Sequence, residues 1–476
     1  MSRTLKRTLF TIGGVVGLLV LAACAVPLLV DVDRYKPRLE AAASDALGMD
    51  VRVDGRLGLG FFPDLHLTVA DARIVGEQGV AVASAKRTRL GIALLPLLRG
   101  EVRLRRIELT QPGLSVVRDP AGRLNVEGLK KVVALLGALD GASVSLSGGT
   151  LTYVDGRSGQ GFEATGLQLK VSRVRLAGVG NPWLGKGSSV DARLACREIR
   201  SKTVTVSTLE ASVRGKDGVF TLEPVTLGIF GGQATGNLRA DASGPVPLYQ
   251  VRCSLRQFRI EEFFGTLSPQ KAAEGAMDFS ASLAMQGTTL GRIVQTATGE
   301  VSLRGSDLRL LGNDLDRAIS RFESTQSFNL VDVGAVFFAG PLGLAVTKGY
   351  GFASLFRGSG GTTSIGLLVS DWSVERGVAQ AKDVALATTE NRIALQGGLD
   401  FVHGRFADVT VAVIDARGCA GVRQAIRGSF ARPTVEKPRV LASLAGPVVG
   451  LYKQTRGLFP AGPCETFYSG SVAPPG

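Results

Sequence analysis

Histidine is scarce in this sequence, and the motifs of common catalytic sites are missing. Two histidines, His66 and His403, occur among 476 residues, which leaves little scope for a catalytic triad or a zinc site. Neither a Gly-x-Ser-x-Gly elbow nor a complete P-loop occurs. No two cysteines form a Cys-x-x-Cys pair, so a dithiol redox site is not expected. We therefore expect neither an enzyme nor a protein that holds a metal or a cofactor.

The few residues that suggest acid–base chemistry have simpler interpretations. Asp314 and Asp316 are close in sequence, but they lie at a predicted helix start, where carboxylates are favoured by the helix dipole. His66 lies between Leu65 and Leu67 in an alternating segment, which indicates a surface or edge position in a strand.

Aromatic residues make up only 6% of the chain, while the formal net charge is +14. Basic residues gather between positions 86 and 106 with no aromatic residue among them, which disfavours nucleic-acid binding. Two interpretations stay open: a surface that meets anionic lipid headgroups or a solvated strand face. The cluster consists of Lys86, Arg87, Arg89, Arg99, Arg103, Arg105 and Arg106.

One long uncharged apolar run, residues 9–30, follows a basic start. It is long enough to span a bilayer, which takes ~20 residues. Arg3, Lys6 and Arg7 precede it, so the N-terminus is expected in the cytoplasm and the rest of the chain is expected to be exported. An alternative is lipoprotein processing at Cys24, although the apolar run continues beyond that cysteine.

Glycine is abundant, with 62 residues, about 13% of the chain against roughly 7% in average proteins. Segments of alternating apolar residues recur between glycine-bearing turns, which predicts one-sided β-strands. The alternation covers Leu57, Leu59, Leu65, Leu67, Val69, Val144, Leu146, Leu167, Leu169, Val171, Val204, Val206, Phe220, Leu222, Val225, Leu227 and Ile229. The turns are expected at 148–149, 215–218, 231–232, 360–361 and 397–398.

Helical periodicity is confined to short segments. Helices are expected at residues 34–47, 126–139, 313–322 and 440–452, the last broken by Pro447. No strand–helix–strand rhythm occurs, so an α/β fold is not expected. Alternation alone does not distinguish a sandwich from one long sheet with an open apolar trough.

Several motifs resemble the AsmA family. The N-terminal ones are residues 28–33, 35–37 and 47–48, then 53–57, 62–65 and 69–74, followed by 227–232, 299–303 and 311–315. The C-terminal ones are Cys419, residues 424–430 with Pro433, residues 444–447, and residues 464–472. Leu47-Gly48-Met49 departs from a common Thr-Gly-Arg, and the chain is shorter than members taken to span the envelope.

The resemblance implies a mainly β protein: an N-terminal transmembrane helix followed by an elongated, curled antiparallel β-groove with short capping helices. It implies anchoring in the inner membrane with the main body in the periplasm. There it implies lipid binding or transfer in phospholipid movement and outer-membrane homeostasis. An alternative is an interaction protein that assists outer-membrane protein assembly through its strand edges. The implied partners are membrane phospholipids and envelope assembly proteins.

The expected division is residues 1–30 for the cytoplasmic tail and anchor, 31–434 for the β-groove, and 435–476 for a C-terminal helix and a cysteine-tied final strand. Because the matching C-terminal motifs contain both cysteines, a disulfide is expected between Cys419 and Cys464; Cys196 and Cys253 provide the alternative pairings. The residues expected to line the groove are Leu167, Leu169, Val171, Val204, Val206, Leu227 and Ile229.

Overall fold

The computed structural model describes residues in the following ranges: 32–62, 64–76, 79–97, 99, 103–126, 143–175, 189–266, 273–312, 314–317, 319–320, 360–436, 439–440 and 464–475. Contacts divide the chain into two compact units, Met1–Phe220 and Thr221–Gly476. Most described residues lie in strands, which confirms a mainly β fold. Within these ranges no helix is long and apolar enough to cross a membrane. The expected span at 9–30 lies outside the described residues.

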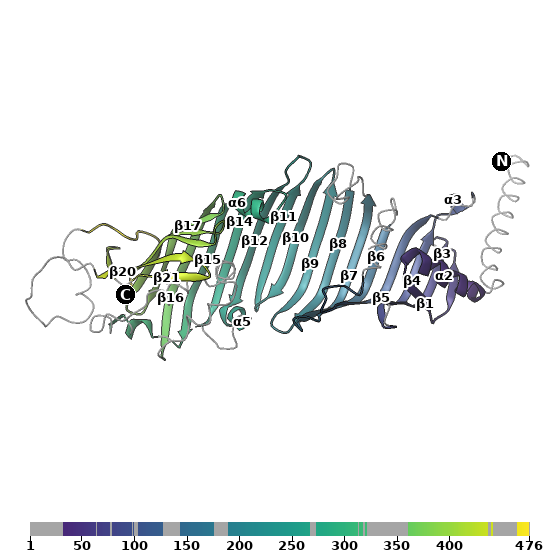
Figure 1. The fold of residues 1–476 in the computed structure, drawn as a ribbon, viewed down its shortest axis with the longest axis horizontal. Coiled ribbons are helices and arrows are strands. Elements are labelled where there is room, and N and C mark those ends of the chain that lie inside the picture. Colours follow the sequence, from purple (N-terminus) through teal and green to yellow (C-terminus); the bar gives the residue numbers. More distant parts are fainter. Residues whose placement is uncertain are drawn as a thin grey trace, which may run out of the picture. The chain divides into compact units, whose positions relative to one another are not determined.

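The first unit contains an open sheet in which β1 and β2 both pair with β3, and β3 to β9 pair in sequence order. Its strands are β1 (Asp50–Val53), β2 (Leu57–Gly60), β3 (His66–Val75), β4 (Ala81–Ile92), β5 (Leu104–Arg118), β6 (Ser143–Asp155), β7 (Gly161–Arg175), β8 (Ser189–Ser201) and β9 (Thr205–Lys216). Figure 1 shows β5 to β9 side by side.

One pair departs from the expected antiparallel arrangement, because β5 and β6 are parallel. The chain leaves β5 at Arg118 and enters β6 at Ser143. This connection is long enough to return the chain to the end of the sheet from which β5 began, as a parallel pair requires.

The expected helix at 34–47 is confirmed as a 3-10 turn, η1 (Val32–Tyr35), followed by α2 (Lys36–Leu47). Pro37 lies in the first turn of α2, where a missing N–H costs little. Gly48 ends the helix in the left-handed conformation, with φ of 68°. Val32 and Leu39 pack against a small core that contains Val53, Leu57 and Val69.

The second unit contains an antiparallel sheet with short helices. Its strands are β10 (Val219–Ile229, which begins before the division), β11 (Gly232–Asp241), β12 (Leu248–Arg259), β13 (Ala273–Glu274), β14 (Ala276–Gln286), β15 (Thr298–Leu311), β16 (Thr362–Glu375), β17 (Val378–Thr388), β18 (Arg392–Asp400), β19 (Arg405–Ile414), β20 (Ala420–Ser429), β21 (Arg432–Val435) and β22 (Arg439–Val440). Further helices in the described residues include α3 (Leu94–Leu97) in the first unit and α5 (Ile260–Gly265) and α6 (Leu290–Thr296) in the second.

The main hydrophobic core lies in the second unit. Met277, Leu368 and Leu386 are fully buried there, and Phe263 of α5 packs in the same cluster. Residues 315–317 and 319–320 are helical, which supports part of the helix expected at 313–322. Of the helix expected at 440–452, Val440 is instead in β22, and the rest lies outside the described residues, as do residues 127–139.

Two of the expected glycine turns are wrong. Residues 148–149 lie inside β6 and residues 397–398 inside β18, and both positions coincide with a shift of strand register. Gly148 and Gly397 have φ of 65° and 107°. A bulge and a turn both use the backbone freedom of glycine, so their sequence signals are alike.

Candidate functional site

One face of the first unit's sheet carries continuous rows of apolar side chains. Residues paired across neighbouring strands project to the same face. The first apolar row consists of Leu59, Leu67, Leu90, Ile107, Val144, Val171, Ala192 and Val213. The second apolar row lies two residues away along each strand and consists of Leu57, Val69, Thr88, Leu109, Leu146, Leu169, Leu194 and Ala211. Thr88 is the single polar member of the two rows.

The opposite face of the same strands is polar. Lys170, between Leu169 and Val171, pairs with Ser145 on β6 and with Arg193 on β8. Further along this row Arg89 approaches Glu108, with 3.4 Å between the guanidinium nitrogen and the carboxylate oxygen. The sheet therefore has one face suited to water and one suited to hydrocarbon.

The start of the apolar face is covered, whereas its continuation has no described cover. Around β1 to β3, residues of η1 and α2 pack onto it. From β4 to β9 the members of the two rows are half-buried, apart from the buried Ala211. None of the three hydrophobic clusters formed by the described residues includes a side chain of β5 to β9.

A line of interrupted pairing crosses this sheet. Gln111, Gly148, Gly166 and Thr208 have φ of 48°, 65°, 68° and 49° in the interiors of β5, β6, β7 and β9. The pairing skips one or more residues at each of these positions, and between β6 and β7 the register also shifts, at Gly149. A shift of this kind is a β-bulge, which bends its strand and increases the local twist.

A third apolar row lies on the far side of this line of interrupted pairing. It consists of Val51, Ile74, Ala83, Leu114, Leu151, Ala164, Ile199 and Val206. Beside its members Leu151 and Ala164, two residues further along β6 and β7, the rings of Tyr153 and Phe162 stack with their centroids 5.5 Å apart.

Two of the seven expected lining residues, Leu169 and Val171, lie in the second and first apolar rows. Leu167 precedes them on β7 and pairs with Gly149, and Val206 lies in the third row. Val204 lies in the turn before β9, where its carbonyl accepts hydrogen bonds from the Ser201 amide and hydroxyl. Leu227 and Ile229 are half-buried in β10.

Sequence reasoning missed most partners of these residues. Ile107, Leu109 and Leu194 belong to the same rows, and their alternation with Glu108 and Arg193 was a usable signal.

The cation cluster is partly neutralised, because Arg89 and Arg106 both approach Glu108, at 3.4 and 3.5 Å.

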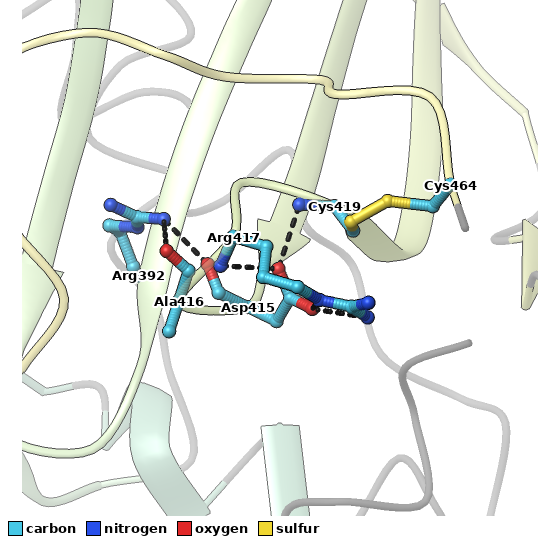
Figure 2. Close-up of a disulfide and its surroundings, with 6 residues drawn as sticks. All are labelled: Arg392, Asp415, Ala416, Arg417, Cys419 and Cys464. Carbon is cyan, nitrogen blue, oxygen red and sulfur yellow. Dashed lines mark hydrogen bonds and ion pairs between the residues drawn. A yellow bond between two sulfur atoms is a disulfide. The ribbon is translucent and has the colours of Figure 1, made fainter. Parts of the chain in front are cut away.

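The expected disulfide between Cys419 and Cys464 is confirmed, with 6.1 Å between the two Cα atoms (Figure 2). Beside it, Asp415 accepts hydrogen bonds from the backbone amides of Cys419 and Arg417, at 2.8 and 2.9 Å. Cys196 and Cys253 are both unpaired thiols. The Cys196 thiol is buried and donates to carbonyls within its own sheet.

The disulfide ties an irregular segment, residues 464–475, onto the second unit. The expected final strand is reduced to one isolated bridge, between Cys419 and Thr466. Phe467, Tyr468 and Val472 are nevertheless buried against a second face of β16 to β20. That face is apolar because alanine and other apolar residues occupy positions at which the alternation of a one-sided strand predicts polar residues. These residues are Val369, Ala385, Ala387, Ala394, Ala412, Ile414 and Ala420.

Polar contacts fix the same segment. Arg392 donates from Nη1 to the Val472 carbonyl at 2.9 Å, and its guanidinium lies 5.6 Å from the Tyr468 ring centroid. The Tyr468 hydroxyl donates to Asp383 at 2.5 Å. Burial, together with this hydrogen bond, raises the pKa of Tyr468. Burial acts to raise the pKa of Asp383 too, but hydrogen bonds from Ser471 and Tyr468 outweigh it, and the net shift is downward.

The residues considered for acid–base chemistry have structural contacts. His66 Nδ1 lies 2.8 Å from the Asp64 carbonyl oxygen. Asp314 Oδ1 accepts from the Arg317 amide at 3.0 Å, and Asp316 Oδ1 accepts from Asn391 Nδ2 at 2.7 Å.

The sequence matches the model of the AsmA family over residues 1–188 and 179–340. The two ranges overlap and together cover more than half of the chain. They end before the C-terminal motifs, so the resemblance of residues 419–472 to the family stays a prediction. No match was found among curated proteins.

Proposed function

We propose that this chain, which belongs to the AsmA family, binds lipid acyl chains on the apolar face of its first unit and acts in phospholipid movement and outer-membrane homeostasis. The observation that supports this function is the stretch of the first and second apolar rows from β4 to β9, where the side chains other than Ala211 are half-buried. Acyl chains would shield this face from water while headgroups stay hydrated, and no bond would be made or broken.

The dimensions are suitable for such a ligand. Six neighbouring strands, β4 to β9, at ~4.8 Å spacing give a face about 24 Å across. One leaflet of a bilayer core is about 15 Å thick, half of the ~30 Å hydrocarbon thickness, so a single acyl chain fits across these strands. Each methylene removed from water contributes about 0.8 kcal/mol, which makes an extended apolar row an effective binding surface.

The proposed location follows from the apolar run at residues 9–30 and the family membership. We propose that this run anchors the chain in the inner membrane and that both units lie in the periplasm. The disulfide between Cys419 and Cys464 supports an oxidising compartment.

The test is lipid extraction from the purified full chain, with two matched variants on β6. Leu146→Asp places a carboxylate in the second apolar row, whereas Ser145→Asp places the same group beside Lys170 on the polar face. We expect lipid to co-purify with the parent and with Ser145→Asp, and to be lost from Leu146→Asp because a buried carboxylate is costly.

Equal lipid content in the two variants would contradict the proposed face. Absence of lipid from the parent, combined with crosslinks between an exposed strand and an outer-membrane barrel protein, would favour the assembly function instead.

A further inference from the structure

Two connections of the first unit lie side by side at one end of its strands. The Ile92 amide donates to the Leu65 carbonyl at 2.8 Å, and the Ala93 amide donates to the Arg103 carbonyl at 2.9 Å. These bonds join the β2–β3 turn to the β4–β5 connection that contains α3. We name the exposed residues of this end the Phe62 edge: Phe62, Leu94, Arg99, Arg103 and Arg105.

The Phe62 edge exposes large apolar side chains at the tips of its connections. Phe62 is 90% exposed and Leu94 is 55% exposed. Isolated exposed apolar residues are common on protein surfaces. Here, however, two of the most exposed ones occupy neighbouring connections at one end of the sheet, where they can enter an apolar phase together.

The charge of the same edge is positive. Two carboxylates lie close to this end, Asp64 in the β2–β3 turn and Glu108, but Glu108 already approaches Arg89 and Arg106, at 3.4 and 3.5 Å. The three arginines of the edge therefore outnumber the remaining carboxylate, Asp64. Among the described contacts, neither Arg99 nor Arg105 has a carboxylate partner. Exposed arginines around exposed apolar tips are typical of surfaces that bind the interface of an anionic bilayer.

The first described residue, Val32, follows the apolar run 9–30 in the sequence and begins a segment that contacts β2. The described chain begins at Val32, and Asp33 Oδ1 accepts a hydrogen bond from the Leu57 amide at 2.8 Å. Leu57 begins β2, and five further residues lead to Phe62, a distance of at most about 17 Å. A bilayer that receives residues 9–30 is therefore within reach of the Phe62 edge.

We propose that the Phe62 edge docks on an anionic lipid bilayer, with Phe62 and Leu94 inserted at the interface and the arginines bound to headgroups. This goes beyond the proposed function, because it assigns the surface through which the first unit contacts the membrane. Docking places Leu59 and Leu90, members of the first apolar row, next to the bilayer. Acyl chains then have a short path from the leaflet to the apolar face.

A tryptophan reporter tests the docking directly. The full chain carrying Phe62→Trp is reconstituted in vesicles of phosphatidylglycerol and phosphatidylcholine, with and without brominated acyl chains that quench tryptophan on contact. The parent, which has two tryptophans, supplies the background. Phe162→Trp is the matched control, because Phe162 lies at the start of β7, at the opposite end of the sheet. Phe62 is nearly fully exposed, so its replacement leaves no core cavity.

We expect bromolipid quenching and a blue shift for Phe62→Trp and neither for Phe162→Trp. Combining the reporter with Arg99→Glu or Arg105→Glu lowers the docking equilibrium constant by at least about five-fold, because each replacement removes one cation and adds one anion. The same replacement of Arg157, which donates to the Pro120 carbonyl at the opposite end, leaves quenching unchanged.

Equal quenching at the two reporter positions, or none at Phe62→Trp, would overturn the docking proposal. So would quenching that is the same in purely zwitterionic vesicles. If lipid still co-purifies with the chain in those cases, the apolar face keeps its proposed function and only the docking surface is wrong.

Discussion

The C-terminal segment provides the sharpest stability prediction, because one bond and a few contacts fix it to the sheet. Cys419→Ser and Cys464→Ser each remove the disulfide, which closes a loop with a sequence separation of 45 residues. In the loop-entropy treatment this bond contributes about 4 kcal/mol to the free energy of unfolding. If opening of the segment is the main response, its open population rises by about a thousand-fold.

Amide hydrogen exchange reads this opening directly. The Phe467 and Tyr468 amides donate to the Gly418 carbonyl at 2.9 and 3.1 Å, and the Val472 amide donates to the Tyr468 hydroxyl at 3.0 Å. We expect these three amides to exchange faster by a similar factor in both variants, because each variant removes the same bond. The matched control is Cys253→Ser, which removes an unpaired thiol.

Unchanged exchange in both variants would refute the reasoning, since the remaining contacts would then hold the segment without the disulfide. A large difference between Cys419→Ser and Cys464→Ser would refute it as well. Non-reducing peptide mapping of protein taken from cells checks the bond itself, and pairing of either cysteine with Cys196 or Cys253 would show the assignment to be wrong.

Three further predictions concern pH, the bulges and the N-terminus. The folded-state pKa of Asp383 lies below its ordinary value of 3.8. Its contribution to the stability of the attached C-terminal segment is therefore complete above that value and is lost as pH falls through the folded-state pKa. Opening of the segment, measured by exchange of the Val472 amide, should increase at low pH in the parent, and Asp383→Asn should remove this pH dependence. Gly166→Ala should lower the free energy of unfolding of the first unit more than Gly148→Ala does, as measured by urea denaturation. Both glycines have similar positive φ, but a Cβ at 166 meets the Arg197 Cβ at 2.8 Å, whereas one at 148 has no contact closer than 3.6 Å. Equal losses would show that backbone strain of about 1 kcal/mol accounts for both. Mass spectrometry of the mature protein should find the residues before Cys24, and a diacylated Cys24 at the N-terminus would contradict the uncleaved anchor.

The fold class was predictable because the alternation of apolar and polar residues is strong in the first unit. Leu169, Lys170 and Val171 show it, and the structure places Lys170 opposite the other two. The same pattern led us to expect Val206 at an apolar position, and it lies in the third apolar row, although lipid contact there remains a prediction. Alternation within a strand does not reveal which strands pair, so the parallel pair of β5 and β6 could not be read from it.

Other features depended on long-range contacts. Residues 148–149 were interpreted as a turn, because glycine with positive φ serves bulges and turns alike. The second apolar face of the second unit is formed by small residues such as Ala385 and Ala412, whose role depends on Phe467 and Tyr468 packing from far along the chain. Small apolar residues at nominally polar strand positions carry little signal until that covering segment is known.

A photo-crosslinking residue placed at Leu169 or at Lys170 tests the central claim most directly. The two positions are adjacent on β7 but project to opposite faces, one beside Leu146 and Leu194 and the other beside Ser145 and Arg193. If the apolar face holds acyl chains, crosslinking in intact cells will give lipid adducts at 169 and few at 170. Lipid adducts at both positions to the same extent, or at neither, would contradict the account.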